Sequence, residues 1–412
     1  MISPSEVTVV ILNVLSWAKG GASALSIENA KLMVSVGFNV VFISADGKTN
    51  AELEKIGVQC LTVEGEAINA EKPLQGMVNG LHNARASQFL QRWIANNDSA
   101  KTVYHLHGWS KIWSPAVFKA LAPVADRLVL HGHDYFPVCP NGAFIHYPSN
   151  TSCNLTPCGA KCLLSACDQR NYAQKIWRFA RGSLRNHWLN FAEKKTKVIL
   201  LHPSMKPFYL KGDFREDQLL VMPNPVKPYS FEKIDAAKNI TFTFIGRLVP
   251  EKGADIFLKS ARQAKVPAKV IGDGPELEKL KADFPEAEFA GWQNYDGISQ
   301  HLKNTRVVVM PSRLRETFGL AAVASVASGV PAIVSEHSAV AEDFVRLGVG
   351  RALSAENVFD WANLMRDLAA NDVAVEVMSQ RGFANWQEVG LTVSQWQQRL
   401  ATLYLQMLES AS

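Results

Sequence analysis

The sequence lacks an apolar run long enough to cross a membrane. Its longest apolar stretch near the start, residues 7–15, is interrupted by Asn13, whereas a transmembrane helix needs about 20 apolar residues. The opening residues, MISPSEV, also lack the basic segment that begins a secretory signal peptide. We therefore expect a cytoplasmic protein.

A strong excess of one charge is absent too. Lys and Arg number 43 against 38 Asp and Glu, which gives a net charge of +5 over 412 residues. Nucleic-acid binding would call for a denser basic stripe, so no nucleic-acid partner is expected. The length exceeds the roughly 250 to 300 residues at which single cores stop growing, so two domains are expected.

Cysteine is scarce outside one segment. Cys60 stands alone, whereas the other five cysteines lie within residues 139–167, which we expect to form a long loop without regular structure. In a cytosolic chain such crowding favours metal binding or free thiols over disulfides, and all three states stay open. Four nearby thiolates can hold a structural zinc ion. The candidates, spaced C-x4-C-x3-C-x4-C, are Cys153, Cys158, Cys162 and Cys167.

Apolar runs and helical patterns alternate along the chain, which predicts α/β architecture. NPVKP at residues 224–228 is typical of a linker and separates two such alternations. Two Rossmann-like domains in series are therefore expected. Strands are predicted at residues 7–15, 39–44, 58–61, 102–107, 127–131, 198–201 and 219–222, and then at 240–245, 268–271, 288–290 and 307–310.

Residues 306–335 form the most informative stretch. They read as an apolar strand, a polar turn with Glu316, a helix opening at Gly319 and a second apolar strand. Ligands of open α/β sheets bind at the carboxyl ends of strands, and a helix N-terminus there favours an anion. The chemistry is expected at this βαβ unit.

Two further strand ends in the second half carry candidate residues. After the strand that ends near Gly246, Arg247 and Lys252 can jointly neutralise a diphosphate. The IGDGP turn places Gly272 and Gly274 where they could lie against a base or ribose, although the segment is also a good turn on structural grounds.

Paired glycines, Gly20 and Gly21, follow the first strand. They allow backbone amides to approach a phosphate or a sugar oxygen, with a plain tight turn as the alternative. The sequence GGASAL does not match the GxGxxG fingerprint, which disfavours an NAD site.

The histidines of HLHG and HGHD give one candidate. His133 is a candidate catalytic residue, with a capping or core histidine as the alternative. We expect His105, His107 and His131 to fall on different strand ends, and predict no metal site from them.

Taken together, GGA, the HD pair at His133, GRLVPEKG, GDGP and MPSRLRETFG followed by SVASGVPAIVS resemble family 4 of the retaining glycosyltransferases, within glycosyl transferases group 1. The resemblance spans nearly the whole chain and is more specific in its C-terminal half. It implies the GT-B fold, with two Rossmann-like domains facing a central cleft. The implied parts are an acceptor-binding domain at 1–222 that contains the Cys-rich loop 139–167, a nucleotide-sugar-binding domain at 223–390, and a helix at 391–412 that crosses back.

The resemblance also implies residue roles. Arg247 and Lys252 would bind the donor diphosphate, Glu316 the sugar hydroxyls, and His133 would lie near the reacting centre, so these four are the candidate catalytic residues. Cations and helix amides stabilise the leaving group, so no metal or other cofactor is needed for the chemistry. The expected donor-binding residues are Gly20, Gly21, Gly246, Arg247, Lys252, Gly272, Gly274, Glu316, Phe318, Gly319 and Leu320.

One position departs from the family pattern. A second glutamate usually follows the first by eight residues, two turns along one helix face, and reaches the ribose; here that position is Ala324. A natural variant, an engineered substitution and a loss of catalysis are the open explanations.

The expected function is that of a retaining glycosyltransferase. It would move a sugar from a nucleotide diphosphate sugar to a hydroxyl of a glycan or lipid-linked glycan, in bacterial polysaccharide or glycoconjugate biosynthesis. A non-catalytic GT-B subunit that binds a glycan or activates a partner, and a GT-B epimerase, are the alternatives.

A basic helical pattern rich in tryptophan, residues 172–195 with a break expected at Gly182, has two interpretations. It either packs on the N-terminal sheet with a solvated basic face or makes a peripheral contact with the inner face of the membrane.

Overall fold

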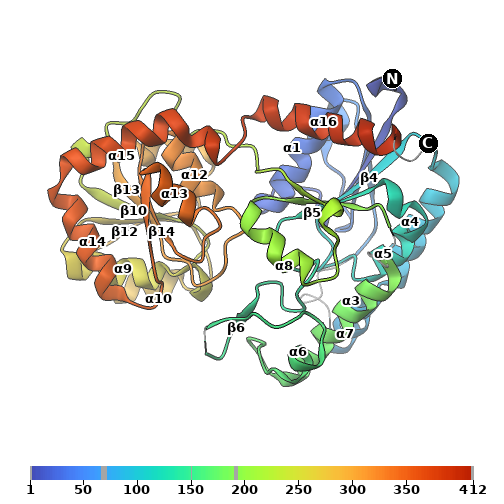
Figure 1. The fold of residues 1–412 in the computed structure, drawn as a ribbon, viewed down its shortest axis with the longest axis horizontal. Coiled ribbons are helices and arrows are strands. Elements are labelled where there is room, and N and C mark those ends of the chain that lie inside the picture. Colours follow the sequence, from blue (N-terminus) through green and yellow to red (C-terminus); the bar gives the residue numbers. More distant parts are fainter. Residues whose placement is uncertain (1, 66–71, 150, 190–193, 410–412) are drawn as a thin grey trace. The chain divides into compact units, whose positions relative to one another are not determined.

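The structure, a computed structural model, describes residues 2–65, 72–149, 151–189 and 194–409. The chain divides into two compact units (Figure 1). The first comprises Met1–Met222 and Gln397–Ser412, and the second comprises Pro223–Trp396. Each unit is a parallel sheet with helices packed on it, so the predicted pair of Rossmann-like domains is confirmed.

The first unit is built on a seven-stranded parallel sheet in the order β3-β2-β1-β4-β5-β8-β9. Every residue of β4 and β5 is buried, which explains why these strands read as mostly apolar runs. The strands are β1 (Thr8–Leu12), β2 (Asn39–Ser44), β3 (Gln59–Thr62), β4 (Thr102–Leu106), β5 (Leu128–Gly132), β8 (Lys197–Leu200) and β9 (Leu219–Val221).

The helices of the first unit pack on this sheet and on one another, as α5 does against α4 and α7. They are α1 (Gly21–Ser35), α2 (Ala51–Lys55), α3 (Pro73–Leu81), α4 (Ala84–Asn97), α5 (Ala116–Leu121), α6 (Ala160–Leu164), α7 (Tyr172–Leu189), α8 (Lys206–Leu210) and most of α16 (Val393–Glu409).

Helix α16 packs along α1. The Gln397 side-chain amide donates to the carbonyl of Leu32 at 3.0 Å. Further along, the ring of Tyr404 meets that of Phe38 edge to face, with the centroids 6.1 Å apart. The end of the chain therefore contributes to the core of the first unit.

The cysteine-rich segment is more ordered than expected. It contains an antiparallel pair, β6 (Ile145–His146) and β7 (Thr151–Ser152), followed by α6. The expected helix break at Gly182 was wrong, because α7 continues through it. A Cβ at Gly182 would lie 2.8 Å from Sγ of Cys158, so this glycine is explained by close packing.

The second unit holds a six-stranded parallel sheet in the order β12-β11-β10-β13-β14-β15. The chain builds outward from β10 in one direction and from β13 in the other, so the strand order reverses between these two strands. Ligands of doubly wound sheets bind at such a reversal. The strands are β10 (Thr241–Ile245), β11 (Ala268–Ile271), β12 (Glu288–Gly291), β13 (Thr305–Met310), β14 (Ala332–Ser335) and β15 (Gly350–Leu353).

In the second unit α9 packs with α14, and α12 packs with α15 (Figure 1). In the described ranges of both units, every helix is too short or too polar to span a membrane. The helices of this unit are α9 (Ala254–Ala264), α10 (Leu277–Asp283), α11 (Tyr295–Leu302), α12 (Leu320–Ala327), α13 (Ala341–Leu347), α14 (Val358–Ala370) and α15 (Asp372–Asn385).

Candidate active site

The candidate site of the second unit lies at the reversal of its strand order, where the loops after β10 and β13 touch. The amide of Arg313 donates to the carbonyl of Glu251 at 2.8 Å. A Cβ at Gly253 would lie 2.1 Å from the carbonyl oxygen of Pro311, and Gly253 has a φ of +75°. Only glycine satisfies both conditions, so this residue lets the two loops approach.

Lys252 and Glu316 form an ion pair across these loops. Nζ of Lys252 lies 2.5 Å from Oε1 of Glu316, and the side chains are 28% and 16% exposed. A partly solvated pair adds little to stability. The structure thus brings together two predicted site residues, and their charges stay within reach of a ligand.

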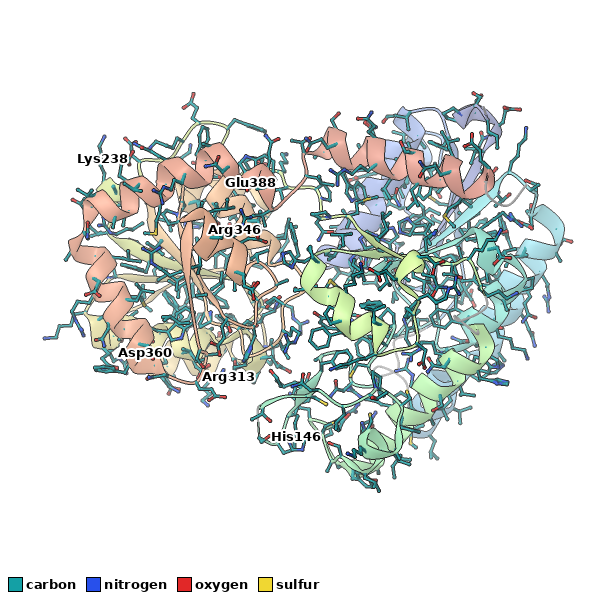
Figure 2. The ribbon with its side chains drawn as sticks, in the orientation of Figure 1. His146, Lys238, Arg313, Arg346, Asp360 and Glu388 are labelled. Atoms are coloured by element: carbon teal, nitrogen blue, oxygen red, sulfur yellow. The ribbon has the colours of Figure 1, made fainter. Side chains whose placement is uncertain are left out.

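Arg247 lies in the same loop as Lys252 and is exposed. Its guanidinium makes no hydrogen bond or ion pair with any residue in the described ranges. Arg313, labelled in Figure 2, differs: it binds both carboxylate oxygens of Asp255 at 2.8 Å. Burial raises the pKa of Asp255, but hydrogen bonds and charge from Arg313 outweigh this and hold the pKa below its usual value. Arg313 is committed to the fold, whereas Arg247 is available to an anion.

The glycines of the IGDGP turn have a packing role. A Cβ at Gly272 would lie 1.8 Å from the carbonyl oxygen of Gly246, and one at Gly274 would lie 2.3 Å from that of Leu248. The turn therefore rests directly on the backbone of the Arg247 loop. This contact alone accounts for both glycines, and donor binding by Gly246, Gly272 and Gly274 stays a prediction.

The start of α12 offers unused amides beside Glu316. Gly319 is the N-cap, with a φ of +74°, so the predicted start of the helix is confirmed. The backbone amides of Phe318, Gly319 and Leu320 donate to no described residue. Free amides at a helix N-terminus favour an anion or a sugar oxygen.

Ala324 is buried in the middle of α12, with 3% of its surface exposed. The expectation that positions 316 and 324 share one helix face was wrong, because Glu316 lies in the loop before Gly319. The eight-residue spacing therefore spans a loop and a helix. A glutamate at position 324 would project from α12, whereas Glu316 projects from the loop before this helix.

In the first unit, Gly20 and Gly21 stand at the start of α1. Gly20 has a φ of +89°, which favours glycine. Gly21 is helical, and a Cβ added to it would meet no atom within 4 Å. The fold therefore gives no reason for glycine at position 21.

His133 belongs to a cluster of four histidines, of which His105, His107 and His131 are buried and His133 is half-buried. His105 is on β4 and His131 on β5, and His107 and His133 follow two residues later on the same strand ends. The histidines do belong to two strand ends, as expected, but these strands, β4 and β5, are neighbours, so the four rings lie together. The rings of His105 and His107 lie 4.1 Å apart, as do those of His131 and His133.

Asn29 of α1 and Tyr404 of α16 close one end of the cluster. Nδ2 of Asn29 lies 3.0 Å from Nδ1 of His105 and 3.1 Å from Nε2 of His107. The Tyr404 hydroxyl lies 2.6 Å from the same nitrogen of His105. Neither Asn29 nor Tyr404 was a predicted site residue.

Burial controls the charge of the cluster. It lowers the pKa of His133 to about 3 and holds those of His105 and His107 well below the usual value, with nearby histidines adding to the effect. The adjacent Asp134 is half-buried, and its desolvation raises its pKa to about 6. At neutral pH the imidazoles of His105, His107 and His133 are therefore uncharged.

The cysteines do not form a comparable group. Among the residues placed by the structure, His105, His107 and His131 are the one set of three potential metal ligands whose ligating atoms all lie within 4.8 Å of one another. Nζ of buried Lys175 lies 3.2 and 3.3 Å from Sγ of Cys162 and Cys167. A structural zinc at Cys153, Cys158, Cys162 and Cys167 stays a prediction, which metal analysis of anaerobically prepared protein tests.

The basic side chains of α7 face inward rather than into solvent. Arg181 donates to the carbonyl of Ser110 at 2.6 Å and lies over the rings of Trp109 and Trp177. Arg185 is 1% exposed and donates to the carbonyl of Phe136. The expected solvated basic face was wrong at these two arginines, which secure α7 to the first unit. Phe191 of the same pattern lies outside the described residues.

Comparison with known proteins identifies the second unit. Residues 227–384 match the family model "Glycosyl transferases group 1". The second domain is a glycosyl transferases group 1 domain. It contains Arg247, Lys252 and Glu316, so the ion pair and the available arginine lie within the matched family region.

Curated relatives match this chain over part of their length. An uncharacterised glycosyltransferase of Methanocaldococcus jannaschii is 26% identical over 34% of this chain and 41% of its own. The Escherichia coli "UDP-Gal:alpha-D-GlcNAc-diphosphoundecaprenol alpha-1,3-galactosyltransferase" is 31% identical over 36% of this chain and 45% of its own. The chain spans about half or less of the relatives with the strongest matches.

Solved structures match over nearly the whole chain. Sucrose-phosphate synthase from Thermosynechococcus elongatus aligns with a TM-score of 0.71 at 14% identity, covering 98% of this chain and 100% of its own. The fold is therefore GT-B, as predicted.

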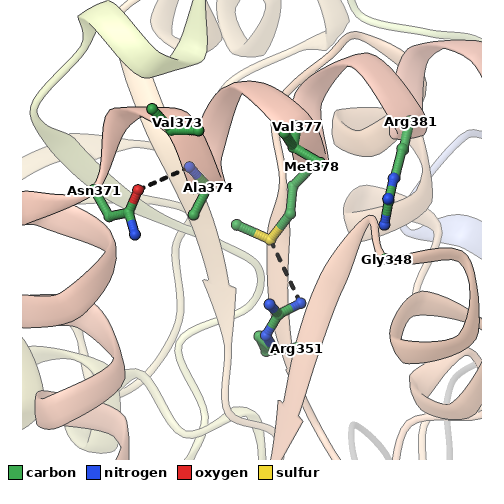
Figure 3. A pocket seen from close by; sticks show the side chains of 8 residues that line it. All are labelled: Gly348, Arg351, Asn371, Val373, Ala374, Val377, Met378 and Arg381. Carbon is green, nitrogen blue, oxygen red and sulfur yellow. Dashed lines mark hydrogen bonds between the residues drawn. The ribbon is translucent and has the colours of Figure 1, made fainter.

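Two cavities lie away from the predicted site residues. One, of about 250 Å³, is lined by the start of β15 and the first turns of α15, including Arg351 and Met378 (Figure 3). It lies at the amino end of β15, opposite the edge at which parallel sheets bind ligands. The other, of about 640 Å³, lies beside α4 and residues 62–64. Neither contains a predicted catalytic or donor-binding residue.

Proposed function

We propose that the chain is a retaining glycosyltransferase. It transfers a sugar from a nucleotide diphosphate sugar to a hydroxyl of a glycan or lipid-linked glycan, in bacterial polysaccharide or glycoconjugate biosynthesis. The observation that carries this proposal is the set of Arg247, the Lys252–Glu316 pair and the amides before α12 at one edge of the group 1 domain. The E. coli relative, whose name gives a nucleotide-sugar donor and a lipid-linked acceptor, supports it.

The reaction follows from charge. Cleavage of a sugar–diphosphate bond builds negative charge on the leaving group, which Arg247 and Lys252 stabilise together with the amides of Gly319 and Leu320. Glu316 accepts hydrogen bonds from the sugar hydroxyls. Arg247, Lys252 and the helix amides supply the positive charge that the leaving phosphate needs, so we propose transfer without a metal. In front-face transfer the leaving phosphate takes the proton of the acceptor hydroxyl.

The N-terminal domain is proposed to bind the acceptor. Two calls stay predictions: that His133 lies near the reacting centre, and that Gly20 and Gly21 approach the donor phosphate.

We propose a peripheral membrane contact through exposed apolar residues of α3 and α7. The Trp177 indole donates to the carbonyl of Met77 and so joins these two helices. The exposed residues are Leu74, Met77, Val78 and Ile176. Sedimentation with anionic liposomes at low salt tests this contact, and no binding would remove it.

A non-catalytic subunit is the second candidate function. The buried Ala324, where the family places a glutamate, favours it. The Lys252–Glu316 pair and the available Arg247 speak against it, because a binding subunit has no need for groups that stabilise a leaving diphosphate.

Nucleotide binding tests the donor site. UDP, GDP and their sugar conjugates are titrated into the full chain by calorimetry. Loss of a charged hydrogen bond costs about 1.5 to 3 kcal/mol, so Arg247→Ala is expected to weaken diphosphate binding by roughly 10- to 100-fold.

Arg346→Ala is the matched control. This exposed arginine pairs with Asp343 at 2.9 Å and Glu388 at 3.0 Å (Figure 2). It lies near the end of α13, just before β15 begins, and so at the other edge of the sheet. Its removal is expected to leave affinity unchanged. If no nucleotide binds the unmodified chain, the donor site and the enzyme proposal both fail; equal weakening by both variants removes Arg247 from the site.

Retention of configuration and metal independence can be tested only on the product of a transfer reaction. The anomeric configuration of the transferred sugar, read by NMR, tests retention, and turnover in EDTA tests metal independence. An inverted product or a complete loss in EDTA would remove the corresponding claim.

A further inference from the structure

The four clustered histidines form two hydrogen-bonded pairs. Ring nitrogens lie 3.2 Å apart in the pair His105–His131 and 3.1 Å apart in the pair His107–His133, with ring centroids 5.3 and 5.2 Å apart. Each centroid separation is close to the nitrogen distance plus the radii of two rings, so the paired nitrogens point at each other. In each pair one ring must donate and the other must accept.

Asn29 decides which ring donates. Its Nδ2 contacts Nε2 of His107, Nδ1 of His105 and the hydroxyl of Tyr404. An amide nitrogen can only donate. The Tyr404 hydroxyl accepts from Nδ2 of Asn29, and its own proton goes to Nδ1 of His105 at 2.6 Å, which is much closer than Oδ1 of Asn29 at 3.4 Å. Both contacted ring nitrogens are therefore acceptors.

This choice propagates along each pair. A neutral imidazole that accepts at one nitrogen carries its proton on the other. His107 thus donates from Nδ1 to Nε2 of His133, and the proton of His133 is left at Nδ1. By the same rule His105 donates from Nε2 to Nδ1 of His131. Burial, which lowers the pKa of His105, His107 and His133, keeps these rings neutral.

We propose that Asn29 is a positioning residue that, through His107, fixes His133 as the neutral tautomer with its proton at Nδ1. His133 is then a hydrogen-bond donor, and its Nε2 cannot take up a proton without breaking the bond to His107. The consequence for catalysis rests on the proposed function: His133 binds a sugar oxygen and is not the general base, in keeping with proton uptake by the leaving phosphate.

The pairing also distinguishes the cluster from a metal centre. A metal ion needs ligand lone pairs that converge on one point. In this cluster His105 and His131 direct nitrogens at each other, and His107 uses one nitrogen for His133 and the other for Asn29. A metal bound by His105, His107 and His131 would have to break both pairs.

Nitrogen NMR of the full chain with ¹⁵N-labelled histidine tests the proposal at pH 7.5. Long-range proton couplings distinguish protonated from bare ring nitrogens, and single His→Gln variants assign the signals. A bare Nε2 and a protonated Nδ1 are expected for His133. Asn29→Asp, which replaces the donor by an acceptor, is expected to place a proton on Nε2 of His107.

Tyr404→Phe is the matched control, because the hydroxyl contacts Asn29 and His105 but neither His107 nor His133. It should leave His107 and His133 as they are in the unmodified chain. A proton at Nε2 of His133, a doubly protonated His133 or stoichiometric metal at the cluster would overturn the proposal. The spectrum of the unmodified chain decides even if Asn29→Asp does not fold.

Kinetics test the positioning role separately. Asn29→Leu is expected to lower kcat by about 10-fold or more with nucleotide affinity unchanged, while Tyr404→Phe changes neither. Equal kcat values for Asn29→Leu and the unmodified chain would remove the role in catalysis. An unmodified chain without turnover but with the expected tautomers would count against the proposed function alone.

Discussion

Glycines serve three distinct purposes in this chain. Gly272 and Gly274 allow two backbones to touch, and Gly20 adopts a left-handed conformation. Gly21 does neither. The approach of a ligand to Gly21 stays a prediction, which a variant can test.

Gly21→Ala separates ligand contact from folding. We expect the melting temperature of the first unit to stay level or rise slightly, because the added methyl meets no atom within 4 Å. Turnover with a nucleotide sugar should fall by roughly 10-fold or more, since the methyl would displace a closely held donor. Calorimetry and steady-state kinetics measure the two effects. Unchanged kinetics would place the donor away from Gly21.

Gly272→Ala is the contrasting variant. Its new Cβ would lie 1.8 Å from the carbonyl oxygen of Gly246, so it should destabilise the second unit whether or not a ligand is present. The sequence alone marks all these glycines equally. The sequence does not distinguish packing glycines such as Gly272 from Gly21, because close packing of a backbone depends on a loop that lies elsewhere in the chain.

At the scale of elements, the stretch around α12 was largely predictable. Apolar β13 and β14 and the glycine before α12 are local signals, and the structure has them where the pattern predicts. The family resemblance placed Lys252 and Glu316 in one site, but their ion pair was not predicted. Local pattern does not give a contact between loops 64 positions apart.

The histidine cluster shows why other parts were missed. Two histidines spaced by two residues share a face of a strand, which the sequence does show. That β4 lies beside β5, and that α16 brings Tyr404 to them from 299 positions away, depends on sheet order and helix docking. Neither is a local property.

Ala324→Glu tests the departure of α12 from the family pattern. We expect it to destabilise the ligand-free second unit, because it places a carboxylate at a buried position. We also expect UDP or GDP to bind roughly 10- to 100-fold more tightly, since a ribose hydrogen bond to a charged group is gained. Thermal shifts with and without nucleotide measure both effects.

Ala322→Glu is the control on the same helix. Ala322 is fully buried, so its substitution should destabilise the domain with no gain in nucleotide affinity. If Ala324→Glu behaves like Ala322→Glu, α12 does not direct position 324 at a nucleotide. The alanine would then be a core residue.

At the scale of the whole molecule, the two units differ in their buried ionisable groups. The histidine cluster and Asp134 lie in the first unit. In the second unit the main contacts of the candidate site are ion pairs that are partly exposed. The sequence alone predicted two α/β domains. It did not predict this difference in ionisable groups, because burial depends on how the chain folds.

The first unit should therefore lose stability in mild acid. His133 has a pKa of about 3 when folded against 6.5 when unfolded, so it contributes stability above pH 6.5 that is lost as pH falls toward 3. One such histidine accounts for roughly 2 kcal/mol between pH 6.5 and 5, and His105 and His107 act in the same direction. Asp134 opposes them, since its raised pKa favours folding below about pH 6, but it is one group against three.

Scanning calorimetry from pH 7.5 to 5 measures this loss, with His107→Gln and His146→Gln as matched variants. Removing His107 from the cluster should flatten the pH dependence of the first transition. His146, which bonds Ser149 outside the cluster, should leave it unchanged. A first unit that is equally stable at pH 5 and 7.5 would mean that the histidines are not buried as neutral groups, and the tautomer assignment for His133 would lose its physical basis.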